Sequence, residues 1–203
     1  MTDKFLDKAY GLDGADDMRG FYDQWAASYE DEVAEYGYTT PGRCADALKQ
    51  HCRTLDEPVL DFGCGTGLSG LALRWAGFKV IDGVDISAEM LEGARSKDVY
   101  RDLRQITADE PPSEPGVYGR IAAIGAIGAG AAPLGCFDTL MDVLATGGKI
   151  VLSFNDHTLE DPIYEARINE YLDGGFASLL FREHGDHLPG RNVKSIVYVI
   201  EKK

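Results

Sequence analysis

The sequence has little positive charge, few histidines and cysteines, and no long apolar run. Its 203 residues include 20 lysines and arginines against 34 aspartates and glutamates, which gives a formal net charge of −14 at pH 7. A surface this acidic repels phosphate backbones and anionic membrane surfaces. We therefore expect no nucleic-acid partner and no membrane partner, and we expect a neutral or cationic small molecule as the substrate.

Other absences exclude further classes of protein. No stretch is long and apolar enough to span a bilayer, and the first residues do not resemble a signal peptide. The four cysteines form no C-x-x-C pair, so we expect free thiols and a cytoplasmic location. The four histidines show neither the H-x-E nor the H-x-x-x-H spacing of a metal site, and we expect no metal.

The most informative part of the sequence is the glycine-rich stretch at residues 59–70, which reads V-L-D-F-G-C-G-T-G-L-S-G. Apolar residues surround an acid, three glycines follow at alternate positions, and apolar residues then recur at helical spacing. This pattern is typical of a buried strand, a tight turn and the start of a helix. Glycines let a ligand approach the main chain closely, and the helix start points N–H groups at it. The stretch therefore predicts a cradle for a nucleotide-type cofactor.

The spacing of the glycines fits two cofactors. Gly65-x-Gly67-x-x-Gly70 satisfies the dinucleotide fingerprint, whereas Asp61-x-Gly63-x-Gly65-x-Gly67 puts an acid two residues before alternating glycines. The second frame resembles motif I of the class I S-adenosylmethionine (SAM)-dependent methyltransferases. A carboxylate there suits the ammonium and sulfonium of SAM and repels a pyrophosphate. We favour SAM as the cofactor, with S-adenosylhomocysteine as its product. No Gly-Lys-Ser/Thr follows the glycines, which excludes a P-loop.

The next apolar run, residues 78–87, supports the SAM interpretation. It ends in Asp85, whose carboxylate we expect to accept hydrogen bonds from both ribose hydroxyls, although NAD proteins place an acid similarly. Ser87 is a helix N-cap candidate. Met90 and Leu91 are expected to line an adenine slot, as the resemblance implies, with plain core packing as the alternative.

The resemblance also implies contacts farther along the chain. A third strand, residues 99–109, ends at Asp109, which we expect to accept the adenine amino group, with Glu110 as the rival. The Gly/Ala segment at residues 125–133 leaves room for the methyl group and the acceptor. The predicted cofactor-binding residues are Asp61, Gly63, Cys64, Gly65, Gly67, Leu68, Asp85, Ile86, Met90, Asp109, Glu110, Gly125 and Tyr22.

The segment F-Y-D-Q-W-A-A-S-Y-E at residues 21–30 resembles the opening of many small-molecule methyltransferases. The resemblance implies that this helix and the following loop cover the SAM pocket, with Tyr22 touching the methionyl part. We expect Trp25 to anchor the helix on the core. Tyr36 and Tyr38 are expected at the substrate entrance.

Catalysis by positioning is expected to dominate, because the sulfonium of SAM is already activated. A general base is needed only for a protonated nucleophile. Asp156 and His157 follow the strand at residues 150–154 and are the candidates, with a plain polar loop as the alternative. We expect His184 and His187 on the surface, in a polar loop between the last two strands.

The pattern of elements predicts an α/β fold. We expect a Rossmann-like, seven-stranded, mostly parallel sheet with one antiparallel edge strand and helices on both faces. A single domain would span residues 1–203, with a loose arm at 1–15, helices covering the cofactor pocket at 16–54 and the core at 55–203. The sequence carries no signal for an oligomeric state.

More narrowly, the passages Y-R-D-L-R-Q-I-T-A-D-E-P and G-A-I-G-A-G-A-A-P resemble a group of orphan methyltransferases named for the Williams–Beuren syndrome chromosomal region. We expect a SAM-dependent methyltransferase acting on a small-molecule acceptor. Two alternatives stay open. One is a non-catalytic protein that binds SAM or S-adenosylhomocysteine, since the Gly/Ala strand end supplies no acid or base. The other is a NAD-dependent oxidoreductase.

Overall fold

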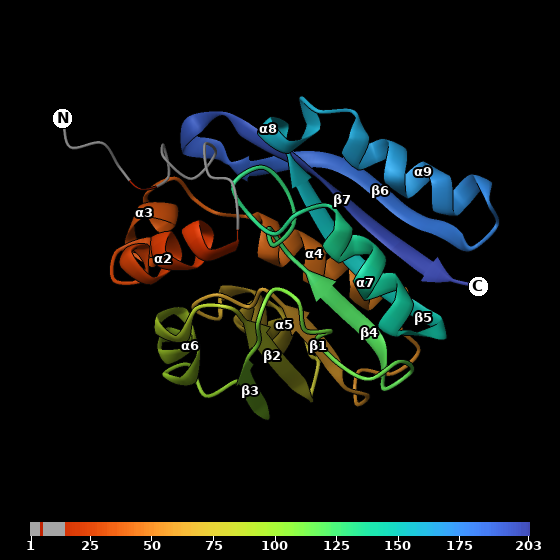
Figure 1. Ribbon diagram of the computed structural model, residues 1–203, viewed down its shortest axis with the longest axis horizontal. Helices are drawn as coiled ribbons and strands as arrows, with labels where there is room; N and C mark the ends of the chain where they lie inside the picture. Colours follow the sequence, from red (N-terminus) through yellow and green to blue (C-terminus); the bar gives the residue numbers. More distant parts are fainter. Residues whose placement is uncertain (1–4, 6–14) are drawn as a thin grey trace.

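A seven-stranded sheet forms the centre of the fold in the computed structural model, which describes Phe5 and residues 15–203 (Figure 1). Most of the predicted arm at residues 1–15 therefore lies outside the described residues. The strands are β1 (Val59–Phe62), β2 (Ile81–Asp85), β3 (Asp102–Gln105), β4 (Tyr118–Ala123), β5 (Leu144–Asn155), β6 (Ala177–Leu188) and β7 (Val193–Lys202). The helices are α2 (Ala15–Trp25), α3 (Tyr29–Glu35), α4 (Thr40–Gln50), α5 (Leu68–Ala76), α6 (Ala88–Arg95), α7 (Gly135–Val143), α8 (Asp156–Leu159) and α9 (Ile163–Asp173), with a 3-10 turn η1 (Pro189–Arg191).

The strand order β3-β2-β1-β4-β5-β7-β6 confirms the predicted fold class. Strands β1 to β5 pair in parallel, and β7 runs antiparallel to both β5 and β6. The reversed strand thus lies one position in from the edge, and β6 is the edge strand. The chain order turns around between β1 and β4, and open α/β sheets bind ligands beyond the carboxyl ends of strands at such a point.

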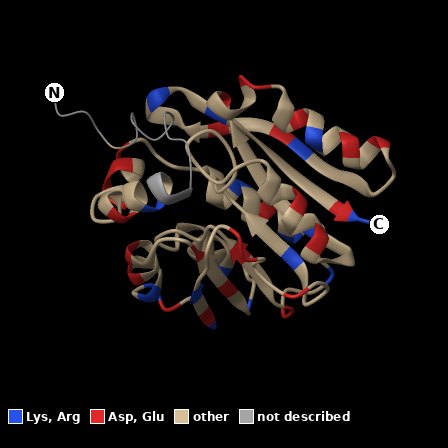
Figure 2. Ribbon diagram, in the orientation of Figure 1, with Lys and Arg blue, Asp and Glu red and all other residues tan. Residues whose placement is uncertain are grey.

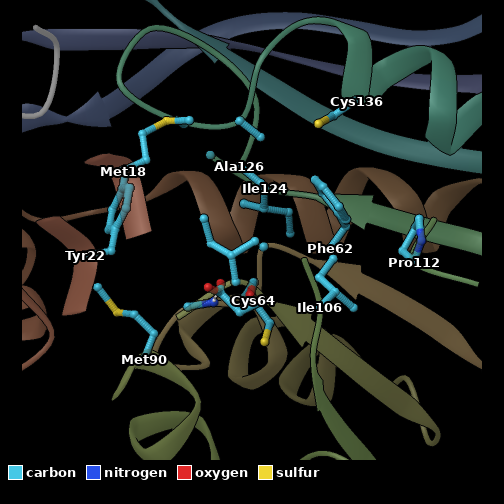
Figure 3. A pocket seen from close by; sticks show the side chains of 18 of the residues that line it. Met18, Tyr22, Phe62, Cys64, Met90, Ile106, Pro112, Ile124, Ala126 and Cys136 are labelled. Carbon is cyan, nitrogen blue, oxygen red and sulfur yellow. Dashed lines mark hydrogen bonds between the residues drawn. The ribbon is translucent and has the colours of Figure 1, made fainter. Parts of the chain in front are cut away.

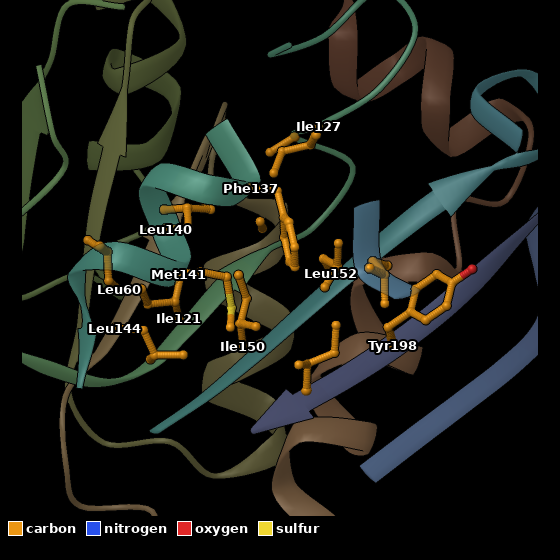
Figure 4. Packing of buried hydrophobic residues seen from close by; sticks show 14 of the residues in the cluster. Leu60, Ile121, Ile127, Phe137, Leu140, Met141, Leu144, Ile150, Leu152 and Tyr198 are labelled. Carbon is orange, nitrogen blue, oxygen red and sulfur yellow. The ribbon is translucent and has the colours of Figure 1, made fainter. Parts of the chain in front are cut away.

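Both faces of the sheet are buried, which explains why its strands are apolar runs. Val59 and Leu60 are neighbours on β1, yet they belong to separate clusters on opposite faces. Helices α4 and α5 cover one face, and α7 and α9 cover the other (Figures 1 and 4). Burying one such aliphatic side chain contributes about 1.5–3 kcal/mol, so these clusters dominate the stability of the fold.

Helices α2 and α3 are attached to α6 through polar contacts. The Ser87 hydroxyl, which also caps α6, donates to Asp23 Oδ1 at 2.5 Å, and Lys97 pairs with Glu30. Helix α2 lies beside α6 in Figure 1. The N-terminal helices are therefore fixed to the part of the sheet that follows the glycine turn.

Three local features of the sheet and its connections stand out. Residues 145–148 are an irregular part of β5, because the two steps from Tyr118 to Arg120 on β4 pair with the five steps from Leu144 to Lys149 on β5. The one-turn helix α8 begins directly after β5, where a loop was expected. Strand β6 continues to Leu188, so the predicted polar loop is mostly strand. Among the helices of the described residues, none has the length and apolar content needed to cross a membrane.

We predict that the α7 side of the core is more costly to disturb than the exposed end of α5. Phe137 is fully buried and its ring lies 5.3 Å from that of Tyr171. Phe137→Ala should lower the free energy of unfolding by about 3–5 kcal/mol in urea titrations. Trp75→Ala is the control, because Trp75 is 81% exposed, and its effect should stay within about 0.5 kcal/mol. Equal losses in the two variants would contradict this placement of the core.

Candidate active site

A cavity of about 280 Å³ opens at the carboxyl ends of β1, β2 and β4. The glycine turn forms its floor, and α2, the segment after β3 and the loop after β4 form its walls (Figure 3). In the described part of the chain, Asp85 and Glu110 are the only charged residues that line it. The cavity thus carries negative charge in an otherwise apolar and aromatic surface.

The glycine turn adopts a backbone that other residues resist. Gly63, Gly65 and Gly67 have φ angles of 66°, 53° and 93°. A Cβ on Gly63 would lie 2.6 Å from the Cβ of Ala126, on the opposite wall. The turn can therefore pass this close to the loop after β4 only because Gly63 has no side chain. Gly67 caps α5 and does not line the cavity.

Asp61 supports the turn from behind. It is fully buried and does not line the cavity. Its Oδ2 accepts hydrogen bonds from Ser69 Oγ at 2.6 Å and from the Tyr100 hydroxyl at 2.8 Å. Burial raises the pKa of Asp61 to about 7, and the two hydroxyl donors offset part of that rise. The expected direct contact between Asp61 and the ammonium of SAM therefore needs correction: the carboxylate fixes the turn to α5.

Asp85, in contrast, faces the cavity from the end of β2. Its Oδ2 accepts from the Gly65 N–H at 2.8 Å and its Oδ1 from the Ser87 N–H at 2.9 Å. Burial raises its pKa, while these N–H donors lower it in part. A carboxylate can accept about four hydrogen bonds, so capacity for about two more faces the cavity, enough for the two hydroxyls of a ribose.

The cavity has two chemically different ends. Phe62, Ile106 and Pro112 lie at one end, where an apolar slot suits a purine ring, and Met18 and Tyr22 lie at the other (Figure 3). Further apolar residues line the cavity between these ends, among them Ile86, Ile124, Ala126, Ala132, Pro133 and Cys136. The two ends match the adenine and methionyl parts of SAM.

Met90 and Thr66 refine this match. Met90 packs against Trp25 at the tyrosine end, so it lies outside the adenine slot in which it was expected. Thr66 lines the cavity, and its Oγ1 is buried with no hydrogen-bond partner among the described residues. Leaving such a group unpaired costs about 1–3 kcal/mol, which a polar ligand in the cavity would recover.

Most predicted cofactor residues line the cavity, namely Tyr22, Gly63, Cys64, Gly65, Leu68, Asp85, Ile86, Met90, Glu110 and Gly125. Asp109 is exposed and does not line it, whereas its rival Glu110 does, while also pairing with Arg104 at 2.9 Å. Burial raises the pKa of the Cys64 thiol well above its usual value, with Asp61 and Asp85 adding to the rise. Cys64 is therefore a small turn residue and not a reactive thiol.

The predicted general bases lie outside the cavity. Asp156 accepts from the Lys194 N–H at 2.8 Å and lies 3.5 Å from His184. His157 is half-exposed beside Glu160. Helix α8 causes this, because it turns these two side chains outward and brings Thr158 inward instead. In the described part of the chain, no group of three or more His, Cys, Asp or Glu could hold a metal ion.

A second, smaller cavity of about 70 Å³ adjoins the first, and we call it the side chamber. Tyr22, Tyr38 and Gly125 line both cavities, and Trp25, Thr158 and the Gly/Ala loop also line the side chamber. Tyr38, which was expected at a substrate entrance, thus lies between the two cavities, whereas Tyr36 lines neither. The Tyr22 hydroxyl donates to the Gly130 carbonyl at 2.9 Å, which joins α2 to this loop.

His187, expected on the surface, is buried and lines the side chamber. The pairing of β6 with β7 shifts between Asp186 and Leu188, so His187 is the extra residue of a β-bulge. A bulge breaks the alternation of faces, and both His187 and Leu188 point inward. No spacing in the sequence marks this bulge, because it arises from the register with β7.

A profile of the methyltransferase domain family matches residues 36–197. The chain belongs to this family. Human methyltransferase-like protein 27 is 35% identical over 152 residues, which are 71% of this chain and 60% of that protein. The predicted class I resemblance and its Williams–Beuren group are thereby confirmed, as is SAM as the cofactor. The NAD-dependent alternative finds no support.

Solved structures show the same fold. The [4+2]-cyclase SpnF has a TM-score of 0.67 at 15% identity and covers 94% of this chain and 97% of its own. A Haloferax volcanii complex between the Trm112 methyltransferase activator and a putative methyltransferase gives a TM-score of 0.65 at 16% identity, covering 89% and 97%. At these identities the likeness concerns the fold alone.

The prediction that excluded a nucleic-acid partner is wrong. The 18S rRNA (guanine(1575)-N(7))-methyltransferase of Saccharomyces cerevisiae is 31% identical over 131 residues, 57% of this chain and 48% of the yeast protein. A ribosomal protein L11 methyltransferase is 32% identical over 100 residues. Net charge describes the whole chain, and acidic residues are spread over α3, α6, α7 and α9 (Figure 2), so it does not determine the acceptor class.

We predict that Asp61 makes stability depend on pH. The folded chain keeps the Asp61 carboxyl protonated up to about pH 7, whereas the ordinary pKa of this carboxyl is 3.8. The folded state binds more protons between these values, so its free energy of unfolding falls as pH rises through this window. Asp61→Asn should remove a slope of up to about 1.4 kcal/mol per pH unit in urea titrations.

Asp109→Asn is the matched control, since Asp109 is exposed and lies outside the cavity. It should keep the pH dependence of the wild-type chain. A wild-type slope in Asp61→Asn would show that the buried carboxyl ionises normally.

Proposed function

We propose that the chain transfers a methyl group from SAM, with the cofactor lying across the carboxyl ends of β1 and β2. The observation that carries the proposal is the cavity in which Asp85, the glycine turn and the unpartnered Thr66 hydroxyl meet. Each group has spare hydrogen-bonding capacity of the kind that the ribose and methionyl parts require.

Individual residues have distinct roles in this proposal. Asp85 accepts the ribose hydroxyls, the slot around Phe62 and Ile106 receives the adenine, and Glu110 lies near its amino group. Tyr22 and Thr66 contact the methionyl part. Asp61 is a positioning residue, because it acts through Ser69 and Tyr100 and not on the cofactor. Residues 1–203 are proposed as a single methyltransferase domain.

SAM supplies, when bound, a methyl group that is already activated for transfer. The chain then has to exclude water and align the acceptor, which can account for most of the rate. Tyr22, Tyr38 and Gly125 line both cavities and so mark where methyl group and acceptor meet. No carboxylate lines the side chamber among the described residues, which supports catalysis by positioning.

Membership of the family does not determine the class of acceptor, so the class has to be identified by an activity test. Relatives are named for methylating rRNA, ribosomal protein L11 and aklanonic acid. The alternative of a non-catalytic SAM-binding protein rests on the Gly/Ala segment after β4, which supplies no acid or base. Methyl transfer from radiolabelled SAM to any member of a panel of rRNA, ribosomal proteins and aromatic ketones would eliminate that alternative.

The cofactor proposal is tested by calorimetric titration with S-adenosylhomocysteine, with NADH in parallel. We expect binding of the first and none of the second. Asp85→Ala should weaken S-adenosylhomocysteine binding by about 1.5–3 kcal/mol, or about 10- to 150-fold in Kd, since hydrogen bonds to a charged group are lost.

Asp109→Ala controls for the loss of a negative charge near the site and should leave the Kd unchanged, because Asp109 lies outside the cavity. An unchanged Kd in Asp85→Ala would remove the ribose assignment. A folded wild-type chain that does not bind S-adenosylhomocysteine would remove the proposed function itself.

A further inference from the structure

The side chamber lies on the part of the sheet that the cofactor leaves free. The cofactor cavity occupies the ends of β1 and β2, whereas residues from the ends of β5 and β6 line the chamber, including Ser153, Asn155 and His187. Its volume of about 70 Å³ exceeds that of one water several-fold. It can therefore hold a group of several heavy atoms that enters past Tyr22 and Tyr38.

Three side-chain oxygens around the chamber each accept one backbone hydrogen bond. Ser153 Oγ accepts from the Gly125 N–H at 3.0 Å, and Thr158 Oγ1 accepts from the Ala129 N–H at 3.1 Å. Asn155 Oδ1 accepts from the Thr158 N–H at 2.9 Å. No Lys, Arg, Asp or Glu lines the chamber among the described residues, so a charged ligand group there meets no counter-ion.

A chain of hydrogen bonds fixes the proton on His187. Arg43 can only donate, and its Nη1 lies 3.0 Å from Ser195 Oγ. Ser195 Oγ lies 3.0 Å from Thr40 Oγ1, which lies 2.8 Å from His187 Nδ1. Ser195 is buried, and Thr40 is the one acceptor for its hydroxyl proton among the described residues, so Ser195 donates to Thr40 and Thr40 donates to Nδ1.

His187 therefore carries its proton on Nε2. Burial lowers the pKa of His187 to about 4, which keeps the ring neutral at neutral pH. The ring is packed edge-on against Tyr38, 5.1 Å between centroids, at the junction of the two cavities. Among the described residues, Nε2 has no hydrogen-bond partner, so it is a free N–H donor beside the chamber.

Trp25 adds a second donor of the same kind. It is 2% exposed and lines the chamber, and its Nε1–H is buried without a hydrogen-bond partner among the described residues. Its ring is held by Tyr22 and Tyr29 at centroid distances of 5.8 and 4.9 Å. A buried unpaired N–H costs about 1–3 kcal/mol, and a bound hydrogen-bond acceptor would recover it.

We propose that the side chamber orients the methyl acceptor by donating hydrogen bonds from His187 Nε2 and Trp25 Nε1 to a neutral carbonyl oxygen. A carboxylate would be buried there without a counter-ion, and a hydrocarbon would leave both donors unpaired. The inference rests on the proposed function and assigns the chemical class of its acceptor. Aryl ketones and the carbonyl edges of nucleobases share this chemistry.

The test compares acetophenone with α-methylstyrene, which has the same shape but a methylene in place of the oxygen. Both are titrated into the full chain saturated with S-adenosylhomocysteine and followed by ¹H–¹⁵N spectra of the two tryptophan indoles. We expect acetophenone to bind at least about fivefold more tightly and to shift the Trp25 indole signal downfield. Trp75→Phe assigns that signal, because the chain has two tryptophans. Uridine, titrated next, distinguishes a nucleobase source from a ketone source.

Variants locate the donors. His187→Phe should abolish the preference for acetophenone, whereas His184→Phe, on the same strand but exposed, should keep it. Trp25→Phe should reduce the preference, and Trp75→Phe should not. The Kd of S-adenosylhomocysteine should stay within about twofold in all four variants. If His187→Phe does not fold, two measurements on the wild-type chain still test the proposal: the shift of the Trp25 indole signal and the preference for acetophenone over α-methylstyrene.

Equal affinity for the two compounds, or binding of neither, overturns the proposal. A loss of S-adenosylhomocysteine affinity in a folded His187→Phe also overturns it, because the chamber would then hold part of the cofactor. None of these results contradicts the proposed function, since cofactor binding is measured separately in the wild-type chain.

Discussion

The hydrogen bond from the Gly65 N–H to the Asp85 carboxylate, 2.8 Å long, joins the ends of two neighbouring strands and determines the shape of the site. It holds the glycine turn after β1 against the end of β2. Asp61 holds the same turn from the other side, through Ser69 and Tyr100. With two carboxylates fixing it, the turn can approach Ala126 so closely that only glycine fits at position 63. The cofactor cavity is the space that this turn leaves open.

The reversal of strand order between β1 and β4 divides the site into two parts with different origins. The floor and one end of the cofactor cavity come from one stretch of chain, from the glycine turn to the segment after β3, while α2 and the loop after β4 supply the other walls. The acceptor part collects residues from α2, the loop after β4, the end of β5 and a bulge in β6. The relatives are named for different acceptors, namely rRNA, ribosomal protein L11 and aklanonic acid.

The net charge of the whole chain differs from the charge around the side chamber. The net charge of −14 is spread over the outer helices, whereas the side chamber has no charged lining residue in the described part of the chain. An argument from net charge to the acceptor class fails for this reason. Electrostatic selection of an acceptor depends on the groups within a few ångströms of it, where screening by solvent is weakest.

The sequence by itself predicted most of the cofactor part, the succession of strands and helices along the chain, and the fold class. These follow from local patterns: alternating glycines after an apolar strand, an acid at the end of the next strand, and apolar runs long enough for buried strands. Most of the predicted cofactor residues line one cavity because they lie within a few positions of a strand end. Asp61 and Met90 were placed in the right region but on the wrong side of it, since periodicity does not say which way a side chain faces beyond the end of a strand.

Only the tertiary structure decided the acceptor part. His187 was expected at the surface because its neighbours are polar, and Asp156 and His157 were expected at the mouth because they follow a strand. One turn of helix directed the latter pair outward, and one unpaired residue in the β6–β7 ladder directed His187 inward. A strand's two faces alternate residue by residue, so a shift of one position exchanges inside and outside. Such a shift depends on how β6 pairs with β7 across the turn at Pro189–Arg191, and the residue pattern of β6 alone does not record it.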